Sequence, residues 1–330
     1  MPGHRHATRS WPKTPNWKHE GKLSLWVIIN ETWNHSSGAA RAPGMLAEDA
    51  ASGSGGILLG FALHGTAGDF MDTSDGGRIE VARQARASGL VAWVTVDNRA
   101  KLNVLGSPLI GELRAAFEAL AAEPDLRAVV LTGAGTRAFI GGADIGEMAT
   151  LTPETARTFI TGLHALCAAI QALPVPVIAR VQGYCLGAGL EVAAACDLRA
   201  ASADARFAMP EVRVGIPSVI EAALLPRLIG AGRAQELVLT GREVAAEEAL
   251  SIGLVERVVP AAELDGAIED WLEALLAAGP RALAAQKKLA QDWRELPLSQ
   301  SIARSIDAFA QAFEDAEPAT MMRAFLERKR

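Results

Sequence analysis

Apolar runs alternate with amphipathic stretches from about Arg78 onward. The segments 91–98 (VAWVTVDN) and 126–135 (LRAVVLTGAG) are almost continuously apolar and end in turn residues, as buried strands do. Residues 108–122, between them, place apolar side chains at helical spacing. Strands that alternate with helices predict a mixed α/β core.

The same pattern continues through the middle of the chain and then becomes mostly helical. It predicts a helix over 153–173, a strand over 175–183, a short apolar helix over 186–196, and strand and turn over 198–211. After Pro217 we expect helices with one further strand, over 221–229, 233–239, 245–252, 255–260 (the strand), 263–278, 280–293 and 299–328. The apolar faces of the last helices predict contacts between copies of the chain.

The first part of the chain lacks this periodicity. It contains five of the six histidines and four of the seven tryptophans, and residues 36–56 are rich in Gly, Ser and Ala. Residues 1–19 carry basic residues and no acid, as transit peptides do, but Pro2, Pro12 and Pro15 interrupt any helix there. We therefore predict an atypical, disordered extension over 1–77, a catalytic core over 78–260 and a C-terminal helical region over 261–330.

Composition narrows the class of protein. Half of the 330 residues are hydrophobic and 21% are charged, which predicts a large buried core. A net charge of −6 argues against a dedicated nucleic-acid binder. The three cysteines (Cys167, Cys185 and Cys196) include no CxxC pair and cannot build a disulfide framework, which favours a reducing compartment. No apolar run reaches the ~18 residues of a membrane span, so we expect a cytoplasmic protein without membrane or nucleic-acid partners.

Histidine chemistry is not expected in the ordered region. His164 is its only histidine, and it lies in an Ala/Leu helix stretch (GLHALCAAI), where we expect it to pack in the core. With His164 packed in the core and no second histidine in this region, neither a Ser-His-Asp triad nor a histidine metal site is expected. Carboxylates and backbone amides remain as candidate groups, and no metal is expected.

A first glycine cluster spans residues 131–148. Gly133, Gly135 and Ala138 imitate a dinucleotide-binding fingerprint after a strand, but the chain continues as loop rather than as a helix. The expected acid at the end of a second strand is also missing. Two alternatives remain: a turn that only connects elements, or a loop 141–143 whose small residues present backbone N–H groups to a ligand.

A second glycine cluster spans residues 181–202. Gly183, Gly187 and Gly189 lead from a strand into an apolar helix that begins near Ala188, and a helix N-terminus offers amide donors to an oxyanion. Glu191 lies one turn into that helix. It is either a harmless first-turn carboxylate or, because its neighbours are apolar, an acid with a raised pKa.

Glu211 follows twenty residues later, also among apolar residues, with Arg213 as a candidate structural partner. Each acid alone is unremarkable. Two acids beside two amide-rich loops predict acid/base chemistry next to a developing oxyanion.

Three motifs, AFIGGADI (138–145), GYCLGAGLEVAAACD (183–197) and AMPEVRVGIP (208–217), resemble the enoyl-CoA hydratase/isomerase, or crotonase, family. The resemblance runs from about residue 89 to residue 293. It implies a crotonase-like α/β fold, a spiral of ββα units with a C-terminal helical trimerisation region, often as a dimer of trimers. It also implies that two backbone N–H groups stabilise a thioester enolate.

Carried over residue by residue, the resemblance assigns roles to this chain. It implies Ala143 and Ala188 as the oxyanion-hole donors, Glu191 as the base that holds water, and Glu211 as the acid that protonates C2. No cofactor is implied, because CoA is part of the substrate. The implied contacts with CoA or substrate are Lys101, Leu102, Gly141, Asp144, Ile145, Tyr184, Leu186, Gly187, Phe207, Pro210 and Val214.

Two segments depart from the family pattern. Residues 98–105 are one residue shorter than the usual adenine-contacting segment. After Pro217 the chain reads SVIEAALLPRL, where many members have a glycine-rich segment that borders the acyl pocket. Glu221 in this segment is either a third acid near the site or a structural carboxylate in the first turn of a helix, and we predict the second.

The presence of both Glu191 and Glu211 favours a hydratase, which adds water in syn fashion to a 2-enoyl-CoA and gives a 3-hydroxyacyl-CoA. A Δ3,Δ2-enoyl-CoA isomerase needs only one acid and is the alternative within the fold. A non-catalytic acyl-CoA-binding homologue and, more distantly, a dinucleotide-dependent oxidoreductase are the others. The expected partners are the acyl-CoA thioester and further copies of the chain, as a homotrimer or hexamer.

Overall fold

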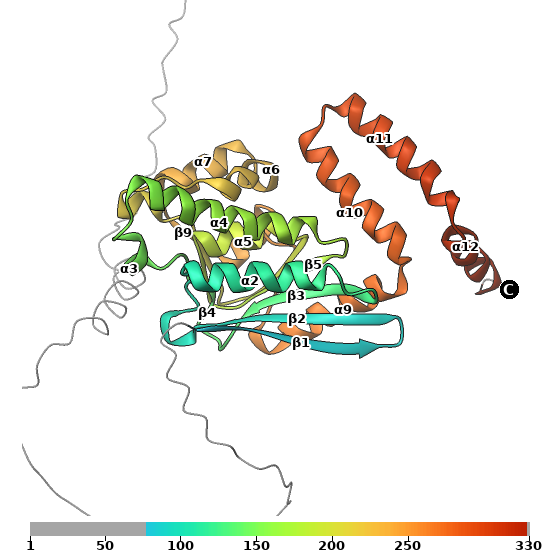
Figure 1. Ribbon diagram of the computed structural model, residues 1–330, viewed down its shortest axis with the longest axis horizontal. Coiled ribbons are helices and arrows are strands. Elements are labelled where there is room, and N and C mark those ends of the chain that lie inside the picture. The colour runs from blue at the N-terminus through green and yellow to red at the C-terminus, as the bar shows by residue number, and fades with distance from the viewer. Residues whose placement is uncertain (1–76, 329–330) are drawn as a thin grey trace, which may run out of the picture. The chain divides into compact units, whose positions relative to one another are not determined.

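The computed structural model describes residues 77–328, so the predicted extension lies almost entirely outside the described residues. A six-stranded sheet with the order β1-β2-β3-β5-β7-β10 forms the centre of this part (Figure 1). β1 is antiparallel to β2, and the other neighbours are parallel. The strands are β1 (Arg78–Arg86), β2 (Gly89–Asp97), β3 (Leu126–Gly133), β5 (Val177–Val181), β7 (Leu198–Ser202) and β10 (Arg257–Val259).

A smaller, four-stranded sheet has the order β4-β6-β8-β9. Its first three strands are parallel and β9 is antiparallel to β8. The strands are β4 (Ala138–Ile140), β6 (Tyr184–Leu186), β8 (Arg206–Ala208) and β9 (Glu243–Ala245). The sequence predicted loop at Phe139 and Ile140, which is wrong, because both residues belong to β4 and are fully buried.

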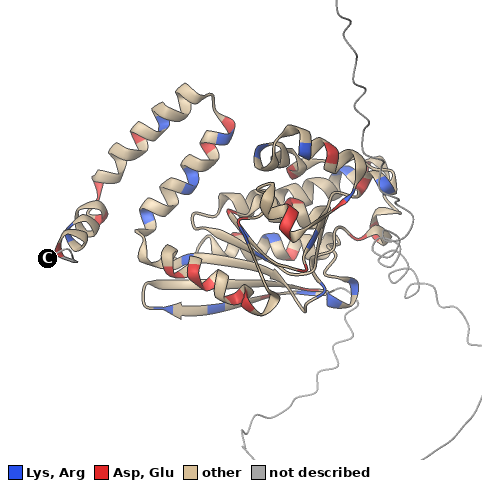
Figure 2. Ribbon diagram, turned by 180° about the vertical axis from the view of Figure 1, so that it is seen from behind, with Lys and Arg blue, Asp and Glu red and all other residues tan. Residues whose placement is uncertain are grey.

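Opposite faces of the six-stranded sheet are covered by different helices, as alternation along a strand requires. On β3, Val129 and Leu131 pack with α2 (Ser107–Leu120) and α4 (Pro153–Ala172) in the main core. Ala128 and Val130 point the other way and pack with α9 (Leu264–Ala277). Figure 1 shows α2 and α4 on one face and α9 on the other, and Figure 2 shows acidic residues along the outer side of α9.

The remaining helices are short and follow strands or turns. The α-helices are α3 (Ile145–Met148), α5 (Ala188–Ala195), α6 (Leu225–Ile229), α7 (Ala231–Thr240) and α8 (Ala246–Ser251). The 3₁₀-helices are η1 (Arg99–Lys101), η2 (Glu211–Val214), η3 (Ile220–Leu224), η4 (Ala261–Glu263) and η5 (Ala312–Glu314). The helix expected over 221–229 is therefore two elements, η3 and α6, which meet before Pro226.

The C-terminal helices are α10 (Pro280–Glu295), α11 (Leu298–Gln311) and α12 (Glu317–Arg328). The prediction of a single helix over 299–328 is wrong, because the chain forms two helices separated by η5 and Asp315. Pro318 cannot donate a backbone hydrogen bond within a continuous helix, which accounts for the break. Since α9 packs on the central sheet, the helices that lie outside the core begin at α10 rather than at residue 261.

One buried cation attaches α10 to the core. The Lys287 ammonium contacts Asp197 Oδ2 at 2.8 Å and donates to the carbonyls of Ile170 at 3.3 Å and Val175 at 3.0 Å. Beyond it, α11 and α12 expose apolar side chains. Within residues 77–328, no helix is long and apolar enough to cross a membrane, and the cytoplasmic location stays a prediction.

Candidate active site

Three motifs of the sequence meet because β4, β6 and β8 are parallel neighbours. Their carboxyl ends lie at one edge of the smaller sheet, where each strand leads into a predicted functional segment. Residues 141–143 follow β4, Gly187 and Ala188 follow β6, and Glu211 follows β8. A Cβ atom on Gly189 would lie 2.1 Å from the Ile140 carbonyl oxygen, so α5 starts directly against β4.

The Ala143 N–H faces away from the neighbouring backbone. Leu105 N donates to Gly142 O at 2.9 Å, and Asp144 N donates to Leu105 O at 3.0 Å. These bonds form a parallel bridge in which successive peptide groups point in opposite directions. The N–H of Ala143, between them, therefore points to the side opposite Leu105, where it can meet a ligand.

The Ala188 N–H opens helix α5. As a first-turn amide it has no acceptor within its own helix, and it lies at the positive end of the helix dipole. Gly187 sets this direction with a φ of +51°, and its N–H donates to Ala208 O at 2.9 Å. A Cβ atom on Gly187 would lie 2.4 Å from Glu211 Oε1, so the Glu211 carboxyl lies directly against the start of α5.

Glu211 is half-buried in the 3₁₀-turn after β8. Burial raises the pKa of Glu211, while the Ser218 hydroxyl, which donates to Oε2 at 2.7 Å, acts in the opposite direction. The predicted pairing of Glu211 with Arg213 is wrong, because Arg213 Nε donates to Thr240 O at 3.3 Å instead.

Glu191 lies in α5 with 5% of its surface exposed. The Ala222 N–H donates to its Oε1 at 3.3 Å. Burial first, and then the negative charge of Glu211, raise the pKa of Glu191 to about 8. The apolar surroundings therefore act on the pKa of Glu191 as the sequence predicted, and Glu211 is close enough to influence the ionisation of Glu191.

His164 does not lie where the sequence placed it, whereas Glu221 lies in the first turn of a helix, as predicted. The His164 side chain is 57% exposed rather than packed in the core, because its position on α4 faces outward. Its Nδ1 lies 2.9 Å from Oε1 of Glu221, whose side chain is buried. Glu221 is in a first helical turn, as predicted, but it is not a solvent-facing carboxylate.

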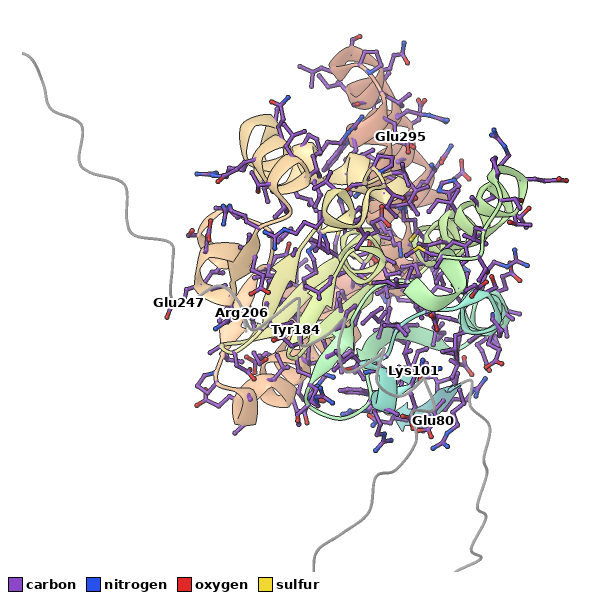
Figure 3. All side chains as sticks on the ribbon, turned by 90° about the vertical axis from the view of Figure 1, so that its left-hand side faces the viewer. Glu80, Lys101, Tyr184, Arg206, Glu247 and Glu295 are labelled. Carbon is purple, nitrogen blue, oxygen red and sulfur yellow. The ribbon has the colours of Figure 1, made fainter. Side chains whose placement is uncertain are left out.

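The other predicted contact residues divide into two groups. Ile145 and Val214 are exposed, and the Asp144 carboxylate caps α3 by accepting from Gly146 N at 2.8 Å. Tyr184 pairs with Arg206 on the neighbouring strand, and Figure 3 shows both on the side of the molecule that also carries Lys101. By contrast, three predicted contacts are buried in the fold, namely Leu102, Leu186 and Phe207, and their role stays a prediction.

The glycines that imitate a dinucleotide fingerprint serve the chain itself. A Cβ atom on Gly133 would lie 2.0 Å from Phe139 O, so this glycine allows β3 to turn back toward β4. Asn103 Nδ2 closes the same turn through Ala134 O at 3.0 Å and Ala138 O at 2.9 Å. Of the two alternatives, the connecting turn describes residues 133–138, and the role of the loop 141–143 in binding a ligand stays a prediction. In the described residues no group of His, Cys, Asp and Glu is arranged to hold a metal ion.

Sequence reasoning missed two donors that act on the carboxyls. The Ser218 hydroxyl and the Ala222 N–H both come from the segment after Pro217. A lone serine among apolar residues, seven positions after Glu211, was the available signal for the first. The second is a backbone group and leaves no signal in the side-chain pattern.

Comparison with known proteins identifies this arrangement. The family model described as enoyl-CoA hydratase/isomerase matches residues 86–330. The chain belongs to the enoyl-CoA hydratase/isomerase family. The crystal structure of an enoyl-CoA hydratase from Bacillus anthracis is similar with a TM-score of 0.72 and 32% identity, over 76% of this chain and 96% of that one. The fold is therefore the crotonase fold.

Two curated members of the family cover most of the chain. A short-chain-enoyl-CoA hydratase from Clostridium acetobutylicum is 34% identical over 73% of this chain and 93% of its own length. A crotonyl-CoA hydratase from Syntrophomonas wolfei is 34% identical over 71% of this chain and 90% of its own length. The region that the family model matches, residues 86–330, starts after the extension and contains the three motifs of the site.

Proposed function

We propose that the protein hydrates 2-enoyl-CoA thioesters to 3-hydroxyacyl-CoA. The observation that carries this proposal is a pair of carboxyls, the buried Glu191 and the half-buried Glu211, next to the Ala143 N–H, which points away from Leu105, and the Ala188 N–H, which opens α5. Water addition needs one group to hold and deprotonate water and another to protonate the adjacent carbon. The names of the related hydratases support the same activity.

The N–H groups of Ala143 and Ala188 are proposed to bind the thioester oxygen. As water adds at C3, negative charge develops on this oxygen, and two fixed donors stabilise it without reorganising. Loss of one donor of this kind typically slows a reaction about 100–1,000-fold. Because both donors are backbone groups on neighbouring loops, the sheet edge fixes the distance between them.

The two carboxyls are proposed to share one proton near neutral pH. Burial raises the pKa of both, and the negative charge of Glu211 raises the pKa of Glu191 further, so that Glu191 keeps its proton while Glu211 is charged. In the free protein, burial favours the proton on Glu191, and Ser218 favours the charged form of Glu211. The expected roles, Glu191 as base and Glu211 as acid, place the proton on Glu211 when substrate is bound.

An apolar acyl group suits the surface next to Glu211. The segment after Glu211 exposes 39–42% of the surface of four apolar residues, Val212, Val214, Ile216 and Val219. An acyl chain that covers these side chains would remove apolar area from water, which is favourable.

We also propose that the chain assembles as a trimer or a dimer of trimers, with α11 and α12 in the contacts.

Incubation with a short 2-enoyl-CoA and analysis of the product tests this function. We expect a 3-hydroxyacyl-CoA in equilibrium with the substrate. Conversion of a 3-enoyl-CoA to the 2-enoyl-CoA, with no hydration, would instead show the isomerase. Binding of both esters without turnover would show a non-catalytic homologue.

A further inference from the structure

A third carboxyl lies beside the two that the proposed reaction uses. Glu221 is 6% exposed, and its Oε1 lies 2.9 Å from His164 Nδ1. Among the described residues, its other oxygen, Oε2, is buried and has no hydrogen-bond partner. Leaving one oxygen of a buried carboxylate without a hydrogen bond is costly, although the Cys167 thiol lies close enough to Glu221 to interact with it.

The turn that carries Glu221 also holds Glu191. Ala222, the next residue, donates its N–H to Glu191 Oε1 at 3.3 Å. The turn η3 packs between α4, which carries His164, and α5, which carries Glu191. Its first residue, Ile220, has a φ of +40°, a conformation that a β-branched residue keeps only where its surroundings impose it. The turn is therefore held in place from both sides.

Charged and titratable groups surround Glu221 on both of these helices. His164 and Cys167 face it from α4, and Glu191 faces it from α5, with Glu211 beyond. The negative charge of Glu221 contributes to the raised pKa of Glu191, after burial and the charge of Glu211. It also contributes, after burial, to the raised pKa of the Cys167 thiol. Glu221 is thus electrostatically coupled to a carboxyl of the site.

We infer that His164 and Glu221 form a positioning pair for Glu191 in the hydration proposed above. His164 fixes Glu221, and with it the turn η3, to α4, so that the Ala222 N–H stays on the Glu191 carboxyl. Glu221 also places a negative charge next to Glu191, in addition to the charge of Glu211. Neither residue touches the reacting atoms, and both act through Glu191.

Glu221→Gln is the main test, because glutamine keeps the shape and an acceptor oxygen but removes the charge. We expect kcat to fall about tenfold, the equivalent of one net hydrogen bond, with KM nearly unchanged. The acid limb of the kcat/KM profile, which reports ionisation of Glu191, should move to lower pH, since a lost negative neighbour lowers the pKa of a carboxyl. Glu269→Gln is the matched control, because Glu269 pairs with Arg86 from α9 on the other face of the sheet.

Substitution of His164 tests the hydrogen bond without disturbing the core, because this side chain is largely exposed. His164→Gln keeps a donor for Glu221 and should retain most of the activity, whereas His164→Leu should lose about as much as Glu221→Gln. The inference would be overturned if Glu221→Gln and His164→Leu both kept the wild-type kcat and the acid limb of their kcat/KM profiles stayed at the wild-type pH. If Glu221→Gln does not fold, the comparison of kcat in His164→Gln and His164→Leu still tests the inference.

A second readout does not depend on turnover. Carboxyl-carbon NMR of protein with labelled glutamate follows the titration of Glu191 directly. Its midpoint should fall in Glu221→Gln and stay in place in Glu269→Gln. An unchanged Glu191 midpoint in Glu221→Gln contradicts the inference even if the wild type hydrates nothing, whereas missing hydration by the wild type contradicts only the proposed function.

Discussion

Glu191 is an acid that the fold holds in a place where its charged form is unfavourable. Because burial raises its folded-state pKa above the unfolded value, the folded protein binds this proton more tightly. The associated stability is fully present below the unfolded pKa, about 4.5, and is lost as the pH rises toward the folded pKa of about 8. The protonated form of Glu191 therefore favours stability, whereas the proposed role of Glu191 as a base needs the charged form.

We therefore predict that Glu191→Gln is more stable than the wild type at pH 8 and above. Glutamine fills the same space and has no proton to lose, so the variant avoids a buried charge, with an expected gain of about 1–3 kcal/mol. Urea unfolding of both proteins at pH 5 and pH 8.5 measures the effect. The difference should be larger at the higher pH, and an equal difference at both would show that Glu191 is not desolvated.

Gly187 is the residue whose replacement should damage the site most directly. Its φ of +51° disfavours any side chain, and a Cβ atom would lie 2.4 Å from Glu211 Oε1. Gly187→Ala should displace the Glu211 carboxyl and the Ala188 N–H together, with a fall in kcat of about 100-fold or more. Gly232→Ala is the control, because no atom lies within 4 Å of its Cβ position in α7, and it should leave kcat unchanged. Similar kcat in both variants would contradict this geometry.

How far residues could be predicted from the sequence depended on the kind of group. Glu191 and Glu211 were found because a charge among apolar neighbours is visible in the chain. His164 was misplaced because one position within an apolar helix does not tell which face it occupies. The Ala222 N–H could not be found, since its direction depends on a strained 3₁₀-turn at Ile220.

At the scale of elements, long apolar runs were predicted well and short strands were missed. The strands β4, β6 and β9 have three residues each, too few for a periodic pattern. β1 was missed because it is an edge strand, mostly exposed, that carries several charged residues. The short strands nevertheless matter most for the site, since they bring Ala143, Ala188 and Glu211 to one edge of the smaller sheet.

Asn103 holds the loop between β2 and α2 against the turn that leads into β4. It is 1% exposed, has a φ of +57° and accepts from Asn98 N at 3.0 Å, in addition to its bonds to the carbonyls of Ala134 and Ala138. Asn103→Ala should lower the free energy of unfolding by about 2–3 kcal/mol, because two buried carbonyls lose a donor. Urea unfolding measures this loss, with Gln84→Ala on the exposed strand β1 as the control. Equal stability of the two variants would contradict the account of this turn.

For the molecule as a whole, the periodicity predicted only a mixed α/β core, and the crotonase fold was predicted from the resemblance of the three motifs to a known family. The assembly is less visible in the sequence, since an exposed apolar helix face does not identify its partner. In the structure α11, η5 and α12 expose many large apolar side chains, namely Leu298, Ile302, Ile306, Phe309, Phe313, Met321, Met322, Phe325 and Leu326. A surface of this kind normally lies in a contact.

We predict that the protein is a trimer or hexamer at micromolar concentration, as sedimentation velocity would show. Ile306→Glu and Phe309→Glu together place charges in the exposed apolar face of α11 and should shift the protein toward smaller species. The control, Ala303→Glu, adds a negative charge at another exposed position of the same helix and should not. A stable, active wild-type monomer at these concentrations would contradict the prediction.

The central claim is that Glu191 and Glu211 have separate tasks in one water addition. Glu191→Gln and Glu211→Gln should each lower kcat for hydration about 100–10,000-fold, with CoA-ester binding nearly intact. The double variant should be little slower than the slower single variant, because the residues act as a unit. Hydration alone, however, does not tell which carboxyl serves which carbon.

Hydrogen–deuterium exchange at C2 of a saturated acyl-CoA in D₂O separates the two tasks most directly. This ester cannot add water, so its exchange needs only the amide donors and the carboxyl that serves C2. The account predicts that the wild type and Glu191→Gln exchange the C2 proton, whereas Glu211→Gln does not. Exchange that persists in Glu211→Gln, or near-wild-type hydration by that variant, would contradict the two-carboxyl mechanism.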